Sequence, residues 1–443
     1  MLLFSARRAS SLVLSSCALL FAVAACSSSS PEGSGSSSGG SSGTAQNDGG
    51  PKPEEEGPLQ PRAVCNTVAA DSATGQGCSG SGSGQELCPV ASTTCGTGTC
   101  VYDTRLDSTF RFYCAPTCTV GGDQLCPLGF ACAAPTASCA QGTAGLCARD
   151  AAWTCNAAID TTGLRYFEGP TGDLFALKSL SGKATLSVLA DKTLRELASW
   201  DEASASVVAV LPLGATRGLL ITTDKEIAFD TASATVAARQ GARSYNQVFG
   251  TLADGSIASL ETTGTIGFAA LQKRGESGQW TEVGPTKKRI GRVLALRSGF
   301  LANTDGELSV SSDGETFTAI AAPPGATLKD ATFVAAGRST EDFYLALAGH
   351  LYRFRKGAWV EEGPRGGAPV AGRSDILRVS TKNVVAFHSW NGQSYSSFIA
   401  SGTTCWRTNQ VRDFEQGTLA GESFFLSPGA SSRDKGLCQV PAK

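Results

Sequence analysis

The chain has 443 residues, which is too long for one small domain and fits two or three. Its 37 basic and 39 acidic residues give a formal net charge of −2, so no overall field attracts nucleic acid or an anionic membrane surface. No nucleic-acid partner is therefore expected. The sixteen cysteines are unevenly placed: two lie in the N-terminal segment, twelve between Cys65 and Cys155, and two near the end.

The first residues have the pattern of a targeting signal. Arg7 and Arg8 precede the apolar stretch 11–25, which is shorter than the ~20 residues of a membrane span. The sequence VAAC at 23–26 then resembles the lipobox of bacterial lipoproteins. That resemblance implies a signal peptide over 1–25 and acylation of Cys26, for example with palmitate. The alternative is an ordinary secretory signal, which would leave Cys26 as a thiol.

Several acyl chains would anchor the protein firmly, at ~0.8 kcal/mol per buried methylene. Ser27 stands where lipoproteins kept at the inner membrane often carry Asp, so the resemblance implies the outer membrane. Exposure on the periplasmic face or on the cell surface stays open. After the lipidated cysteine, residues 26–60 are rich in Ser and Gly and predict a disordered tether, which would span about 30 Å root-mean-square.

Residues 61–155 predict a small disulfide-rich module. Leu, Val, Ile and Phe fill only 13 of these 95 positions, too few for a conventional core. Disulfides must supply the stability, and the pairing cannot be assigned from sequence. The stretch 113–132 resembles small extracellular cysteine-rich modules, which implies no catalytic residue. No Cys-x-x-Cys and no histidine occur here, so zinc is disfavoured, and neither metal nor cofactor is expected. The twelve cysteines are Cys65, Cys78, Cys88, Cys95, Cys100, Cys114, Cys118, Cys126, Cys132, Cys139, Cys147 and Cys155.

The remainder, 160–443, contains a repeat. GQWTEVGP at 278–285 returns as GAWVEEGP at 357–364, which aligns Trp280 with Trp359, and a weaker copy places Phe317 between them. Extending the register in both directions adds Leu194, Val236 and Tyr395, with spacings of 36 to 44 residues. Strand-like segments precede each position, and Asp254-Gly255 and Asp305-Gly306 are hairpin signals in which both residues need positive φ.

This period predicts an all-β fold, a β-propeller with six blades or, as the alternative, seven. Trp280, Phe317 and Trp359 are expected to pack between blades, not to stack on a ligand. Ser311–Phe317, SSDGETF, resembles the Asp box of sialidase-type propellers, although it is one residue shorter than that pattern. The resemblance, over about 170–411, implies a structural turn at Asp313. The sialidase Phe/Tyr-Arg-Ile-Pro signature is absent, so no catalytic residue is assigned.

Two further expectations concern the last two cysteines and the two histidines. Cys405 and Cys438 are expected to bond to each other and fasten the last blade, with Cys155 bonded to either one as the alternative. His350 and His388, the only histidines, lie in apolar strand-like segments and are expected to be packed or at a rim.

The function favoured by these features is noncatalytic. The chain would be an envelope lipoprotein, held in the membrane by its N-terminal lipid, whose propeller binds an unidentified envelope protein or polysaccharide. A carbohydrate-active enzyme using the propeller face is one alternative, and convergent arginines and carboxylates there would favour it. A structural role, with the cysteine module assembling with other envelope proteins, is the other.

Overall fold

The computed structural model describes residues 60–68, 78, 87–90, 95–105, 112–137, 139, 144–150, 153–202, 205–239, 246–262, 265–329, 331–367, 375–390, 395–402, 404–409, 417–426 and 436–442. The predicted signal peptide, Cys26 and the tether before residue 60 lie outside them. The regular elements of the described residues are all strands. None of these residues belongs to a helix long and apolar enough to cross a membrane.

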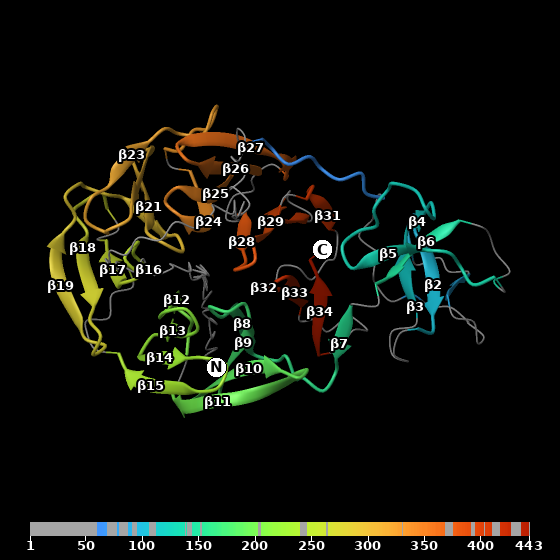
Figure 1. Ribbon diagram of the computed structural model, residues 1–443, viewed down its shortest axis with the longest axis horizontal. Coiled ribbons are helices and arrows are strands. Elements are labelled where there is room, and N and C mark those ends of the chain that lie inside the picture. Colours follow the sequence, from blue (N-terminus) through green and yellow to red (C-terminus); the bar gives the residue numbers. More distant parts are fainter. Residues whose placement is uncertain are drawn as a thin grey trace, which may run out of the picture.

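Seven four-stranded antiparallel sheets form a ring, so the described residues build a seven-bladed β-propeller (Figure 1). The predicted all-β propeller is confirmed, and the preferred count of six is corrected to the alternative of seven. Within the described residues, six of the seven pairs of neighbouring blades contact each other through their first strands, and blades 1 and 2 contact each other through their fourth strands. The first strands therefore line the centre of the ring. Alternating apolar residues bury one face of each strand against the next blade, which is the usual source of propeller stability.

The first six blades follow one another along the chain. Blades 1 to 3 comprise β8 (Leu164–Glu168), β9 (Leu174–Leu180), β10 (Lys183–Ala190) and β11 (Thr193–Asp201); β12 (Ala209–Pro212), β13 (Gly218–Ile221), β14 (Lys225–Phe229) and β15 (Ala234–Ala238); and β16 (Gln247–Thr251), β17 (Ile257–Glu261), β18 (Ala270–Arg274) and β19 (Trp280–Pro285). Blades 4 to 6 comprise β20 (Arg292–Ala295), β21 (Phe300–Thr304), β22 (Glu307–Ser311) and β23 (Thr318–Ile320); β24 (Phe333–Ser339), β25 (Asp342–Leu347), β26 (His350–Arg355) and β27 (Ala358–Arg365); and β28 (Ile376–Val379), β29 (Val384–Trp390), β30 (Tyr395–Ser401) and β31 (Arg407–Asn409).

Blade 7 combines strands from both sides of the ring. It contains β32 (Thr418–Ala420), β33 (Ser423–Leu426) and β34 (Leu437–Pro441), and its outermost strand is β7 (Thr154–Asn156), which precedes blade 1. β7 pairs antiparallel with β34, with Cys155 opposite Cys438. The ladder therefore fastens the end of the propeller to its beginning. β7 falls inside the predicted module, so the propeller begins before residue 160.

This closure explains why the repeat count was short by one. The repeat positions of blades 1 to 5 lie on or directly before the fourth strand of each blade: Leu194, Val236, Trp280, Phe317 and Trp359. Tyr395 instead opens β30, a third strand, and Trp406, just before β31, takes the repeat position in blade 6. The seventh is Trp153, directly before β7. Trp153 lies 41 residues before Leu194 (194 − 153), within the spacing of the other positions, but it falls in the cysteine-rich segment 61–155 that the sequence assigns to the module.

The hairpin signals are partly confirmed. Asp305 (φ 53°) and Gly306 (φ 94°) both have positive φ between β21 and β22, as expected of a two-residue hairpin turn. In the second turn, between β16 and β17, only Gly255 (φ 81°) does. There the Asp254 carboxylate accepts a hydrogen bond from Ser256 N at 2.9 Å, a side-chain turn in which the aspartate keeps negative φ.

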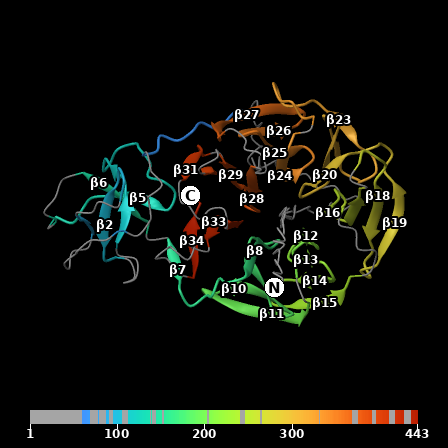
Figure 2. The ribbon, with the colours of Figure 1, turned by 180° about the vertical axis from the view of Figure 1, so that it is seen from behind.

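The disulfide-rich region contains two small sheets, drawn in cyan beside blades 6 and 7 in Figure 1 and seen from behind in Figure 2. The first sheet orders β1 (Leu87–Val90), β2 (Thr99–Asp103) and β3 (Phe112–Ala115). The second orders β4 (Thr117–Cys118), β6 (Gly145–Arg149) and β5 (Phe130–Ala133). Five disulfides lie within the region: 78–100, 88–139, 95–114, 118–132 and 126–147.

The module and the propeller share one hydrophobic core. Leu128 and Phe130 of the module belong to the same buried cluster as Trp153, Phe424 and Val440 of blade 7. The surfaces approach closely at Gly129, where a Cβ atom would lie 2.5 Å from the Trp153 ring. The two regions therefore fold against each other and are not joined by a free linker.

Candidate binding site

Each blade presents its first-to-second and third-to-fourth strand turns at the same end of the ring, because its strands alternate in direction. We call this end the turn face. Three features of the described residues meet there: a buried ion pair near the centre, and two cavities on either side of blade 5. The contacts between blades come first, because they position these features.

Trp280 and Trp359 pack against the blade before their own, as predicted. Trp280 in blade 3 donates its indole N–H to Glu226 of blade 2 and packs edge-on against Phe249. Trp359 in blade 5 donates to the Ala321 carbonyl, just after blade 4, at 2.7 Å, and its ring meets Phe343. Each indole thus joins two blades through an apolar ring and one directed hydrogen bond.

Phe317 and Asp313 form a structural turn between β22 and β23. Phe317 is buried in the cluster between blades 3 and 4. The Asp313 carboxylate accepts hydrogen bonds from Glu315 N and Thr316 N at 2.8 Å and from the Ser311 hydroxyl at 3.0 Å. Despite partial burial, these donors hold the pKa of Asp313 below its usual value. The Asp313 carboxylate therefore stabilises the turn in which it lies.

A buried carboxylate ties four blades together near the centre of the turn face. Glu168, at the end of β8, accepts hydrogen bonds from Thr381 N, the Thr381 hydroxyl and Gly421 N, which lie in the first turns of blades 6 and 7. Arg297 of blade 4 lies 3.7 Å away, and both side chains are almost fully enclosed. Burial raises the pKa of Glu168 and lowers that of Arg297 to about 10. Enclosure makes this pair a structural tie.

The first cavity lies between blades 5 and 6 and has a volume of about 190 Å³. Four of its lining residues are arginines and one is an acid, namely Arg62, Arg338, Arg353, Arg355 and Asp342. Asp342 accepts both ends of the Arg353 fork, at 3.1 and 3.2 Å. The Arg353 guanidinium also lies over the Tyr344 ring, 5.3 Å from its centroid. The lining therefore keeps an excess of positive charge around a rigid aromatic wall.

Arg62 reaches this cavity from outside the propeller. It belongs to residues 60–68, the N-terminal strap, which Figure 1 shows in blue, crossing from the module toward blade 5. Its guanidinium donates to the Tyr344 hydroxyl at 2.9 Å and lies 3.5 Å from buried Glu362. Trp406 donates its indole N–H to the same carboxylate. The cavity wall thus depends on a segment far away in sequence.

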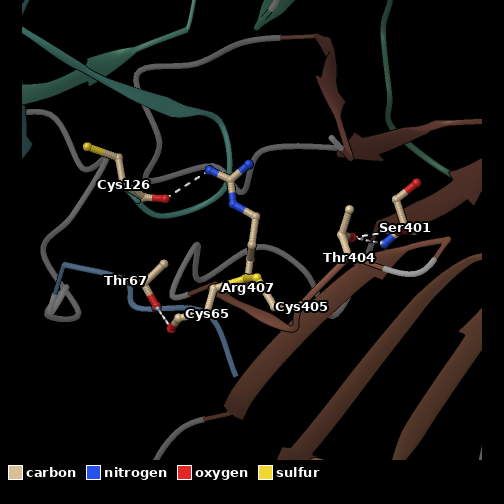
Figure 3. Close-up of a disulfide and its surroundings, with 7 residues drawn as sticks. All are labelled: Cys65, Thr67, Cys126, Ser401, Thr404, Cys405 and Arg407. Atoms are coloured by element: carbon tan, nitrogen blue, oxygen red, sulfur yellow. Dashed lines mark hydrogen bonds between the residues drawn. A yellow bond between two sulfur atoms is a disulfide. The ribbon is translucent and has the colours of Figure 1, made fainter. Parts of the chain in front are cut away.

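The strap is held by backbone pairing and by a disulfide. Cys65 N donates to the Trp406 carbonyl and Trp406 N to the Ala63 carbonyl, each at 2.8 Å, and the Cys65–Cys405 disulfide adjoins this pairing. Figure 3 shows that bridge with Arg407 beside it, whose guanidinium donates to the Cys126 carbonyl of the module at 2.9 Å. Blade 6, the strap and the module are thereby fixed to one another.

The predicted Cys405–Cys438 bond is wrong. Cys405 bonds to Cys65, and Cys438 bonds to Cys155, the alternative that the sequence left open for one of them. The physical reason is strand pairing: Cys438 and Cys155 face each other across β34 and β7, whereas Cys405 lies beside the strap. The module therefore has five internal bridges and two shared with the propeller, instead of six internal ones.

The second cavity lies between blades 4 and 5 and is larger, about 640 Å³. Its lining mixes polar turn residues with apolar strand residues, among them Asp313, Thr316, Glu341, Phe354 and Lys356. Because Asp313 is occupied by its own turn, Glu341 and Lys356 are the charged side chains left to meet a ligand there. Both cavities border blade 5, which makes that blade the centre of the candidate site.

The histidines are packed or at a rim, as predicted. His388 is buried, and its Nδ1 lies 2.7 Å from the Ser397 hydroxyl. Burial, with a contribution from Arg378, lowers the pKa of His388 to about 3. His350 is half-buried, with Nδ1 2.9 Å from Glu361. The sulfurs of Cys78, Cys95 and Cys100, and those of Cys118, Cys126 and Cys147, cluster within metal-binding distances, but each is in a disulfide and not a thiolate.

Sequence reasoning missed the arginine cavity. Its four arginines come from the strap, from β24 and from β26, so no local motif joins them. The one available signal was the position of Arg62, three residues before the first cysteine of the module. Because Arg62 lies only three residues before a disulfide-bonded cysteine, it is held in place although it follows the tether directly. The cavity is a product of tertiary structure.

Comparisons with known proteins give no family. No family model matches the chain, and no curated protein matches it. Among solved structures, it is similar to virginiamycin B lyase from Staphylococcus aureus with quinupristin (10% identity, 65% of this chain and 99% of that one, TM-score 0.44) and to YCF48 bound to D1 peptide (12%, 66% and 98%, 0.40). The WD40 domain of SCAP from fission yeast is a third (11%, 62% and 81%, 0.38). At such identities and TM-scores, the propeller assignment rests on this chain's own sheet topology.

Proposed function

We propose that the protein is a lipid-anchored protein of the outer membrane whose propeller binds an envelope protein or polysaccharide without transforming it. The VAAC sequence at 23–26 supports the anchor at Cys26, and the Ser/Gly-rich tether would hold the propeller away from the membrane. We also assign Ser311–Phe317 as a degenerate Asp box, which the hydrogen bonds of Asp313 to its own turn support.

The observation that carries the binding role is the placement of two cavities around blade 5 on one face. Binding sites are concave, and both cavities are hollows whose linings combine mainly charged and polar side chains with a few apolar ones, which suits a polar or charged ligand. Each also lies between two blades, so rigid strands hold its lining. A partner that covers the turns of blade 5 would reach both cavities.

The enzyme alternative has less support. Glycosidases use two carboxyl groups that face a bound sugar, one as general acid and the other as base or nucleophile. An arginine and a carboxylate do converge near the centre of the turn face, but Glu168 is enclosed and saturated by four partners. The cavity between blades 5 and 6 also gathers four arginines, but Asp342 is the one carboxylate among its described lining residues, and it accepts both ends of the Arg353 fork. The assembly alternative relied on an independent cysteine module, whereas this module shares its core with blade 7.

The anchor is tested by metabolic labelling with a fatty acid in the native cell. Replacement of Cys26 by Ser should abolish acyl labelling and leave an unprocessed precursor, because serine cannot form the thioether. Normal acylation of that variant would disprove the lipoprotein assignment. The result is independent of any binding measurement.

The binding role is tested by retention of envelope proteins and polysaccharides on the immobilised mature chain. Lys356 lies in the turn between β26 and β27 and lines the larger cavity. Lys356→Glu reverses its charge and should weaken retention of the partner at least tenfold. Lys192→Glu is the matched control, since Lys192 lies in the corresponding turn of blade 1 and, like Lys356, has positive φ. Equal retention by both variants would remove blade 5 from the binding site.

A further inference from the structure

The cavity between blades 5 and 6 is a positively charged hollow with a rigid lining. Four arginines and one aspartate line it, and with the buried Glu362 beside Arg62 the formal excess is two positive charges (four minus two). Two of the arginines are held in place: Arg62 by Tyr344 and Glu362, and Arg353 by Asp342 and the face of Tyr344. Concentrating like charges in this way costs free energy unless an anion joins them.

Arg338 is the arginine of this cavity whose guanidinium is available to bind a ligand. It is exposed at the end of β24, and among the described residues no carboxylate pairs with it. Its charge is felt nearby, because it contributes to lowering the pKa of buried Arg297. An arginine that lines a cavity with its fork unused is suited to a bidentate oxyanion contact.

We propose that this cavity binds a phosphate monoester. A volume of about 190 Å³ lies below the ~300–1,000 Å³ of sites for drug-sized ligands, so it admits one compact group while the remainder of the ligand stays outside. A phosphate monoester carries a charge of about −1.5 to −2 at pH 7, which matches the local excess better than a single carboxylate. Arginine forks also complement its three oxygens.

The inference deepens the proposed function by naming the chemistry of the ligand, and it rests only on the binding role. It does not depend on lipidation. It also makes the N-terminal strap part of the site, since Arg62 supplies one wall and the Cys65–Cys405 bridge holds that residue against blade 6.

Titration calorimetry of the detergent-solubilised mature protein with inorganic phosphate, at constant ionic strength against chloride, tests the proposal. Saturable binding at one site is expected, and Arg338→Gln should weaken it at least tenfold. Arg217→Gln is the matched control, because Arg217 is an exposed arginine in the corresponding first turn of blade 2. The phosphate affinity of this variant should stay within twofold of wild type. Since Arg338 is exposed, its variant should keep the wild-type denaturation midpoint.

Two soluble esters then distinguish the sources of the group. Glucose 6-phosphate represents a phosphorylated sugar, and short-chain phosphatidic acid represents a lipid headgroup; tighter binding of either one supports the proposal and assigns the source. Tighter binding of glucuronate than of phosphate would overturn it in favour of a carboxylate. So would non-saturable phosphate binding, or an unchanged affinity in Arg338→Gln. Retention of an envelope partner despite any of these results would leave the proposed function standing while this inference fails.

Discussion

The module and the propeller solve the same problem of stability in opposite ways. The module has few apolar residues and closes five short loops with disulfides, whose sequence separations run from 14 to 51. The propeller has large apolar clusters between its blades and no disulfide joining two of its first six blades within the described residues. Covalent closure therefore replaces a hydrophobic core where the sequence is poor in apolar side chains.

The boundary between the module and the propeller is stabilised both by a hydrophobic core and by disulfides. Phe130, Trp153 and Val440 share a core there, and the two longest-range bridges, Cys65–Cys405 and Cys155–Cys438, lie there as well. Their separations are 340 and 283 residues. The bridges thus fasten the last two blades, where a propeller is most prone to open.

The largest expected effect comes from removing a blade-packing indole. Trp406 is fully buried, and it joins Glu362 and the strap, so Trp406→Ala should lower the free energy of unfolding by about 3–5 kcal/mol. Trp359 keeps part of its ring exposed, and Trp359→Ala should lose about 2–3 kcal/mol. Chemical denaturation without reductant measures both. A larger loss at Trp359 than at Trp406 would contradict the packing described for blades 5 and 6.

The long-range bridges should matter next. Replacing Cys155 and Cys438 together by Ser should cost about 2–4 kcal/mol, because the bridge closes a long loop of the unfolded chain. The same change at Cys118 and Cys132, 14 residues apart, should cost about 1–2 kcal/mol less. Nonreducing peptide mapping comes first: a cross-linked peptide joining Cys405 to Cys438 would refute this connectivity.

Acid should weaken the propeller through His388. Its pKa is about 3 in the folded state and about 6.5 when unfolded, so the unfolded chain binds the proton more readily. Stability is therefore present at neutral pH and is lost as the pH falls below about 6.5. This residue should account for a loss of about 2 kcal/mol between pH 8 and pH 5. Denaturation of His388→Gln at both values provides the comparison, and an identical pH dependence would exclude His388 as the cause.

The smallest effect is expected at the turn between β22 and β23. Asp313→Ala removes the acceptor of three hydrogen bonds from a largely exposed turn and should cost about 1 kcal/mol. Asp313→Asn keeps an acceptor and should lose less. Thermal melting of the two variants, measured together with retention of the envelope partner, separates stability from function, because Asp313 lines the larger cavity. A structural turn predicts unchanged retention in both.

Much of the fold follows from sequence because its cause is local. The period of about 40 residues, the alternating apolar residues and the Asp-Gly turns each concern neighbours along the chain, and together they predict a propeller with Trp280 and Trp359 between blades. The scarcity of apolar residues in 61–155 likewise predicts disulfides. Cys26, on which the predicted location depends, is also a matter of local sequence, and it awaits the labelling experiment.

The blade count, the cysteine partners and the arginine cavity were decided by tertiary structure. β7 joins β34 across almost the whole propeller, so Trp153 belongs to the last blade although it precedes the first along the chain. Cys155 meets Cys438 because their strands pair in register. Arg62 and Arg338 become neighbours only when the strap lies against blade 6. Closing a ring is a constraint between distant residues. A local pattern determines each blade but carries no information on which residues the closure brings together.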